Sequence, residues 1–120
     1  MAVTPEVLLA AAEALGRGTS EVDWRNAASR GYYAAFHRCR SVAQDARLPL
    51  PERGSVHAGL IEALTHNLNP LSLKGLGYML AQCRTRRADA DYRIDQDFPQ
   101  KMAQTVLSES RRILDKAEAL

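Results

Sequence analysis

Residues 20–47, SEVDWRNAASRGYYAAFHRCRSVAQDAR, predict one helix that is longer than any other in the chain. Ser20 followed by Asp23 resembles a capping box with Asp in place of the usual Glu, and it marks the start of this helix. The helix ends before residues 48–51, Leu-Pro-Leu-Pro, because proline disfavours a helical residue before it. Helical spacing predicts one face made by Val22, Ser29, Tyr33 or Tyr32, Phe36 and Ala43.

Shorter helices are predicted on both sides of this long one. The first starts at Thr4, with Pro5 in the first helical position, and ends at residues 16–18, Gly-Arg-Gly. Ser55 caps a helix that runs to about residue 66, and another runs from about residue 72 into a group of arginines. The predicted inner side of the first helix is Val7, Leu8, Ala11 and Leu15.

The last helix follows a polar connection over residues 93–99. Its predicted apolar stripe is Ala103, Val106, Leu107, Ser110, Ile113, Leu114 and Ala117. Short connections between long helices imply antiparallel neighbours. Residues 1–120 are therefore predicted to form a single all-α domain, an up-and-down bundle of four to five helices. Gly75 and Gly77 either weaken the fourth helix locally or allow a close helix approach.

The composition excludes some classes of function. The net charge of +2 is too small to indicate nucleic-acid binding by itself, although 13 of the 16 basic residues are arginine. Cys39 and Cys83 lie far apart, outside any zinc motif, so no metal or other cofactor is predicted. Free thiols fit a reducing cytoplasm, and we expect a cytoplasmic protein. The sequence has no signal-peptide pattern and no apolar run of the roughly 18–20 residues that a bilayer requires.

Residues 84–93, RTRRADADYR, are the first candidate functional stretch. If the fourth helix continues through them, Leu80, Arg84, Arg87 and Asp91 follow steps of four, three and four and lie on one stripe. Four arginines and four aspartates occur between residues 84 and 97, so the stretch is no simple basic patch. A functional cluster and a solvated helix end with Arg–Asp pairs both fit this pattern.

The second candidate stretch lies in the long helix and its exit. Residues 25–53 contain six arginines and two acids, and aromatic residues are interleaved with them. Such a pattern can hold RNA by phosphate contacts and base stacking. Arg30, His37 and Tyr32 are therefore candidate RNA- or nucleotide-binding residues. The alternative is that Phe36 and Tyr33 belong to the core while the arginines face water.

Two runs together resemble the HEPN-domain family. Residues 29–37, SRGYYAAFH, resemble the SRxYYAxFH run of the second HEPN helix, and residues 87–92, RADADY, resemble the RxxADY run near the end of the penultimate helix. His57 lies where many members have a histidine. The resemblance implies a HEPN-like bundle that forms a homodimer. It also implies a toxin-type, metal-independent ribonuclease whose antitoxin partner is a nucleotidyltransferase of the MNT type, or else a noncatalytic module that binds nucleotide, RNA or a partner protein.

The resemblance implies roles for the residues of the first candidate stretch. Arg87 would bind the phosphate with Arg84 as a helper, and Asp91 and Tyr92 would complete the catalytic group. Nuclease members have a histidine four to six residues after the arginine, but in this chain no histidine follows His66. The proton shuttle would then be Asp91 or Tyr92 with a displaced pKa, or His37 or His57 reaching the site from another helix. A ribonuclease, a noncatalytic binding module and a helical interaction domain all remain open.

Overall fold

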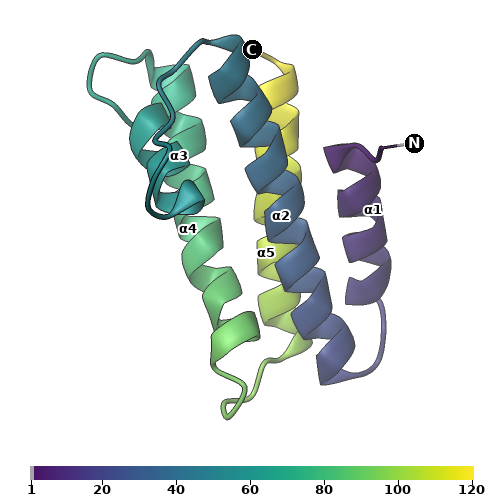
Figure 1. Ribbon diagram of the computed structural model, residues 1–120. Coiled ribbons are helices and arrows are strands. Elements are labelled where there is room, and N and C mark those ends of the chain that lie inside the picture. The colour runs from purple at the N-terminus through teal and green to yellow at the C-terminus, as the bar shows by residue number, and fades with distance from the viewer. Residues whose placement is uncertain (1) are drawn as a thin grey trace.

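The computed structural model describes residues 2–120, which form five helices and no strand. The helices are α1 (Pro5–Gly16), α2 (Glu21–Asp45), α3 (Val56–Leu64), α4 (Leu71–Tyr92) and α5 (Gln100–Glu118). Figure 1 shows α1, α2, α4 and α5 running alternately down and up, with the short α3 beside the upper half of α4. The predicted all-α bundle is confirmed.

Three helices begin at the residues that the sequence predicted, because a side-chain oxygen caps each start. Thr4 accepts a hydrogen bond from the backbone N–H of Val7 at 3.2 Å. Ser20 and Ser55 cap α2 and α3 in the same way, also at 3.2 Å. Each cap satisfies one of the N–H groups that a helix leaves without a partner in its first turn.

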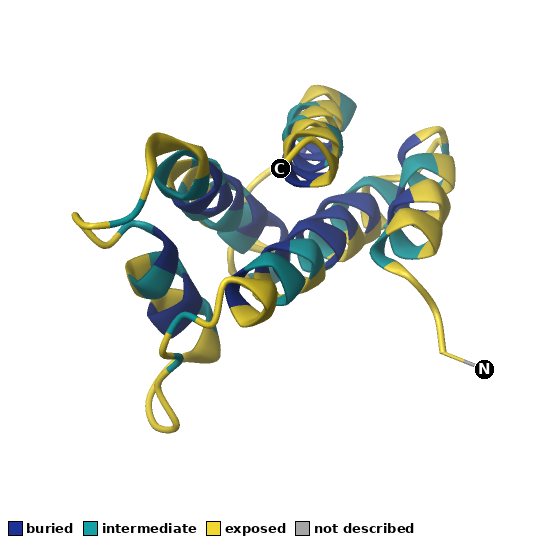
Figure 2. Ribbon diagram, turned by 90° about the horizontal axis from the view of Figure 1, so that it is seen from above, coloured by how far each residue is buried: buried dark blue, intermediate teal, exposed yellow. Residues whose placement is uncertain are grey.

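The long helix α2 is the centre of the bundle and packs against each of the other four helices. The buried faces of the helices point toward one another, and the exposed faces point outward (Figure 2). All seven residues of the stripe predicted on α5 are buried, which confirms that prediction. The largest fully buried side chains are those of Tyr32, Phe98, Leu9, Leu64, Leu76, Leu80 and Ile113.

The predicted inner side of α1 was right for Leu8 and Leu15, which pack against the core, and wrong for Val7 and Ala11. Val7 is 55% exposed and Ala11 is exposed, whereas Leu9 and Ala12 are fully buried. An alanine-rich helix offers several apolar stripes of similar strength, and the packing partner selects one of them. On α2, Val22 was also placed wrongly, since it is 66% exposed.

Close approaches between helices occur at glycines. A Cβ on Gly77 would lie 2.5 Å from Thr65 Cγ2 and 2.9 Å from Leu64 Cβ. Gly77 therefore lets α4 approach the end of α3, which is one of the two roles predicted for it. Gly75 has no such neighbour, because nothing lies within 4 Å of a Cβ at that position.

Candidate functional site

The helix α4 continues through the whole arginine-rich stretch and ends at Tyr92. No basic residue occupies its last turn, so the C-terminal carbonyls need donors from elsewhere. Arg25 on α2 supplies them. Its Nη1 donates to the carbonyl oxygens of Asp89 at 3.3 Å, Ala90 at 3.1 Å and Arg93 at 3.3 Å, and its Nη2 donates to Gln96 O. This arginine holds the end of α4 against α2.

Arg87 is the buried centre of the site. It is 4% exposed, and its Nη1 donates to Asp91 Oδ2 at 2.7 Å, one helical turn further on. Its guanidinium carbon lies 4.5 Å from the centroid of the Tyr32 ring and 5.8 Å from those of Tyr33 and Tyr92. These distances fall within the range of cation–π attraction. The Nε of Arg87 is buried and has no hydrogen-bond partner.

Arg87 keeps its charge despite this burial. Desolvation lowers its pKa, but hydrogen bonding with Asp91 and Tyr92 and the negative charge of Asp91 act in the opposite direction, and the net effect raises the pKa of Arg87. Asp91 also accepts a long hydrogen bond, 3.4 Å, from the hydroxyl of Ser29 on α2. The Arg–Asp pair thus joins α4 to α2 and is no solvated helix end.

Tyr32 connects this buried arginine to a histidine. Tyr32 is fully buried, and its hydroxyl lies 2.7 Å from Nδ1 of His57 in the first turn of α3. Burial raises the pKa of Tyr32 to about 12, so the hydroxyl stays protonated at neutral pH. The Phe36 ring packs against the His57 ring, with 4.4 Å between the centroids. His57 is therefore fixed on two sides.

The surroundings of His57 lower its pKa and so favour the neutral imidazole. Burial lowers its pKa, and the positive charges of Arg87 and Arg84 lower it further, with a smaller effect from His37. A neutral imidazole has one ring nitrogen without a proton. The direction of its hydrogen bond with Tyr32 depends on the tautomer: when Nδ1 donates to the Tyr32 oxygen, Nε2 can accept a proton, and when the Tyr32 hydroxyl donates to Nδ1, Nε2 carries the proton.

Arg84 lies one turn before Arg87 on α4 and is partly exposed. Its Nη2 lies 3.4 Å from the Ser55 hydroxyl oxygen, which also caps α3. The outer part of the site thus contains Arg84 and the half-buried His57, while Tyr92 is 74% exposed at the other end. Arg87 is more deeply buried than any of these residues, so Arg84 is the more accessible of the two arginines to an anion in solvent.

The structure brings five of the predicted site residues together: Arg84, Arg87, Asp91, Tyr92 and Tyr32. The other two, Arg30 and His37, are exposed on α2. Within residues 2–120, no hydrogen bond, ion pair or aromatic contact joins either of them to Arg87.

Two predictions about the tyrosines need correction. The Tyr32 ring is fully buried, so it is closed to the base stacking expected of a binding residue; its ring contacts Arg87 and its hydroxyl contacts His57. The assignment of Tyr33 rather than Tyr32 to the core was also wrong, because Tyr33 is only half-buried. Phe36, by contrast, is 5% exposed and belongs to the core as predicted.

Sequence reasoning named His57 only as one of two histidines that could reach the site, and it missed Arg25 and Ser29. His57 follows the Ser55 cap by two residues, which fixes its place in the first turn of α3. Nothing local indicates that this turn packs on Tyr32. Among residues 2–120, no group of three or more His, Cys, Asp or Glu side chains is arranged to hold a metal ion.

Comparison of the chain with family models, curated proteins and solved structures gave no match. The site must therefore be interpreted from its own geometry. Along the part of the chain that the structure describes, no helix is both long enough and apolar enough to cross a membrane.

Proposed function

We propose that this chain is a metal-independent ribonuclease of the HEPN type, which cleaves RNA by attack of a 2′-hydroxyl on the adjacent phosphate. The observation that carries the proposal is the position of His57, 2.7 Å from the hydroxyl of the tyrosine whose ring lies against Arg87. A neutral histidine on α3 takes the place of the histidine that is missing after the arginine on α4.

Each group has a role in this reaction. The Nε2 of His57 accepts the proton of the 2′-hydroxyl as the 2′-oxygen forms a bond to phosphorus. The bond from phosphorus to the 5′-oxygen breaks, that oxygen takes a proton from water, and the hydroxide left behind takes the proton held by His57, which restores the neutral imidazole. The products are a 2′,3′-cyclic phosphate and a 5′-hydroxyl. Arg84 stabilises the negative charge on the phosphate oxygens. Arg87 acts from beneath by holding Tyr32 and Asp91 in place.

A second candidate is a noncatalytic module that binds RNA through the same surface. The burial of Arg87 favours it, because the HEPN resemblance makes this arginine the phosphate-binding group of the nuclease, and a guanidinium that is 4% exposed and paired with Asp91 does not reach a phosphate in this conformation. In that case Arg84 carries the phosphate contact and His57 has only a structural role.

The two functions differ in a single assay. Purified protein is incubated with a labelled oligoribonucleotide in EDTA, alongside the same oligonucleotide with 2′-deoxy sugars throughout. The ribonuclease produces 2′,3′-cyclic phosphate ends from the first and leaves the second intact. The binding module shifts the RNA in a gel without cleaving it, and its affinity falls steeply as salt rises. If RNA is neither cleaved nor bound, both functions are wrong.

We propose a homodimer and an MNT-type nucleotidyltransferase antitoxin as partners, on the basis of the HEPN resemblance. The exposed apolar side chains Val22, Tyr92 and Ile94 support a protein contact, since they occur where Arg25 joins the start of α2 to the end of α4. Light scattering at micromolar concentration tests the dimer. Rescue of growth arrest by the co-expressed nucleotidyltransferase tests the antitoxin.

A further inference from the structure

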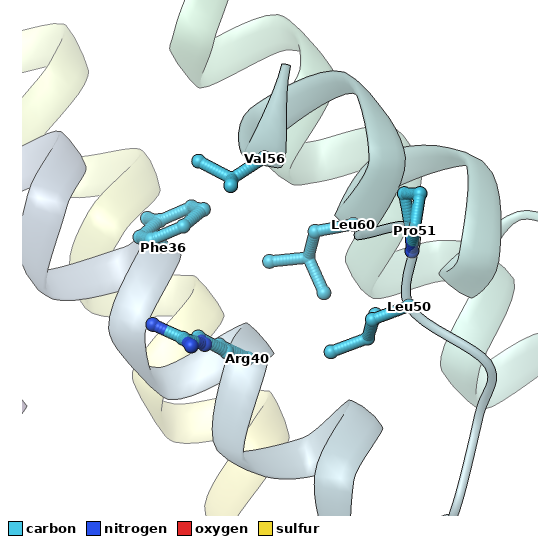
Figure 3. Close-up of a pocket in the computed structure, with 6 residues that line it drawn as sticks. All are labelled: Phe36, Arg40, Leu50, Pro51, Val56 and Leu60. Atoms are coloured by element: carbon cyan, nitrogen blue, oxygen red, sulfur yellow. The ribbon is translucent and has the colours of Figure 1, made fainter. Parts of the chain in front are cut away.

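We propose that a small cavity beside α3 binds one aliphatic side chain from an acidic segment of a partner protein. The cavity has a volume of about 70 Å³ and lies between α2, α3 and the connection that joins them. It is lined by Phe36, Arg40, Leu50, Pro51, Val56 and Leu60, which come from these three elements (Figure 3). Five of the six are apolar, and Arg40 is the only charged one.

The floor and the rim of the cavity differ in exposure. Phe36 and Leu60 are buried, at 5% and 2% exposure, and form the apolar floor. Val56 is 61% exposed and stands at the rim. A water molecule occupies about 30 Å³ in the liquid, so the cavity has room for one small aliphatic group. Pockets for drug-sized ligands are several times larger, roughly 300–1,000 Å³.

The cavity is held open by contacts within the chain. Pro51 packs directly on Gly59 of α3, where a Cβ would overlap the proline ring. The N–H of Leu48 donates to the Ala43 carbonyl at 3.0 Å and fixes the start of the connection on α2. A preformed cavity reduces the conformational entropy that binding must overcome.

Arg40 indicates the charge of the partner. Arg25 and Arg38, on the same helix, are paired with Glu21 and Glu6, whereas Arg30 and Arg40 are in none of the ion pairs among residues 2–120, and of these two only Arg40 lines the cavity. Arg40 is exposed and has no carboxylate within ion-pair distance among residues 2–120. A partner segment with an aliphatic side chain would fill the apolar cavity, and an acidic residue beside that side chain would pair with Arg40.

The size of the cavity favours a protein over a small free molecule. A free ligand that fills about 70 Å³ has only a few non-hydrogen atoms and correspondingly little binding energy. One side chain anchored in such a pocket is instead typical of protein interfaces, where few residues carry most of the affinity. None of His57, Arg84 and Arg87 lines the cavity, so peptide binding there can be measured apart from RNA cleavage, although Phe36 on the cavity floor also packs against the His57 ring.

The test uses peptide probes and methyl NMR of the whole chain. The probe is the blocked pentapeptide Gly-Glu-Leu-Glu-Gly, and the signals are the methyl groups of Leu50, Val56 and Leu60. We expect saturable shifts of these methyls. Serine in place of the leucine should weaken binding about tenfold or more, because the buried aliphatic contact is lost. Lysines in place of the glutamates should weaken it about two- to fivefold, as for an exposed ion pair.

Two variants and a matched control complete the design. Val56→Phe fills the cavity from an exposed position and should abolish binding of the probe. Val7→Phe places the same ring at a 55% exposed valine in the first turn of α1, away from the cavity, and should leave binding unchanged. Arg40→Gln should remove the preference for glutamate over lysine.

Three results would overturn the proposal. The first is equal binding of the leucine and serine peptides, and the second is unchanged binding by Val56→Phe. The third is a shift of the same methyls by an oligouridylate but not by any peptide, which would make the cavity a nucleobase site. Circular dichroism of each variant confirms that it is folded before the comparison.

Discussion

Removal of the Arg87 side chain tests whether the buried Arg–Asp pair stabilises the bundle. We expect Arg87→Ala to lower the free energy of unfolding by about 3 kcal/mol. The charge-assisted hydrogen bond to Asp91, 2.7 Å long, contributes about 1.5–3 kcal/mol. The desolvated stacking on Tyr32 adds about 1–2 kcal/mol. Asp91 remains 24% exposed and can recover some hydration, which keeps the total at the lower end of the range for broken buried pairs.

The end of the same helix offers a matched control in Arg93, the C-cap residue that follows Tyr92. Arg93 pairs with Asp89 at the same spacing of four residues, but its side chain is 62% exposed. Exposed pairs of this kind contribute about 0.3–0.5 kcal/mol, so Arg93→Ala should change the free energy of unfolding by no more than that amount. Urea unfolding followed by circular dichroism at 222 nm compares both variants with the wild type. The urea concentration at half-unfolding reports the change in stability, provided that the slope of the free energy of unfolding against urea stays the same. If Arg87→Ala costs no more than Arg93→Ala, the reasoning about burial is refuted.

Three further changes have defined outcomes. The pKa of His57 is lower in the folded than in the unfolded chain, so its contribution to stability should be complete above about pH 6.5 and be lost as the pH falls through the folded-state pKa. NMR titration of the His57 ring should give a pKa below about 6.5, and a higher pKa would contradict this reasoning. Gly59→Ala should destabilise the fold by about 1–3 kcal/mol, because the added methyl group overlaps with Pro51. Gly75→Ala has open space around it and should stabilise α4 by about 0.5–1 kcal/mol. Thermal melts in which Gly59→Ala is the more stable of the two variants would refute the packing of Pro51 on α3. Arg25→Ala should lower the free energy of unfolding by about 2 kcal/mol, because the carbonyl oxygens of Ala90 and Arg93 lose their donor. Trypsin should then cleave the connection between α4 and α5 faster. An unchanged cleavage rate would show that Arg25 does not hold the end of α4 in place.

Local chemistry made much of the fold predictable. The side chains of Ser20 and Ser55 bond to N–H groups three residues ahead, so the helix starts could be read from short stretches. The stripe on α5 alternates clearly with polar residues and was predicted in full. The inner side of α1 was not predictable in the same way, because Val7, Leu9, Ala11 and Ala12 are all apolar and only the packing against α2 and α5 distinguishes them.

The site was predictable only where it lies within one helix. The steps of four and three residues placed Arg84, Arg87 and Asp91 on one stripe of α4 before their contacts were known. The contact between Tyr32 and His57 joins residues 25 positions apart and depends on how α3 packs on α2. Adjacent residues such as Tyr32 and Tyr33 differ by about 100° around the helix, and a small error in the predicted face exchanged their roles.

The central claim is that His57 transfers the proton in RNA cleavage. The most direct measurement is the rate of oligoribonucleotide cleavage in EDTA by the wild type, by His57→Gln and by His66→Gln, which changes an exposed histidine just after α3. If His57 is the proton acceptor, His57→Gln should lower the rate about 10²- to 10⁴-fold, and His66→Gln should leave it unchanged. Equal cleavage by the wild type and His57→Gln, with both proteins folded, would contradict this claim.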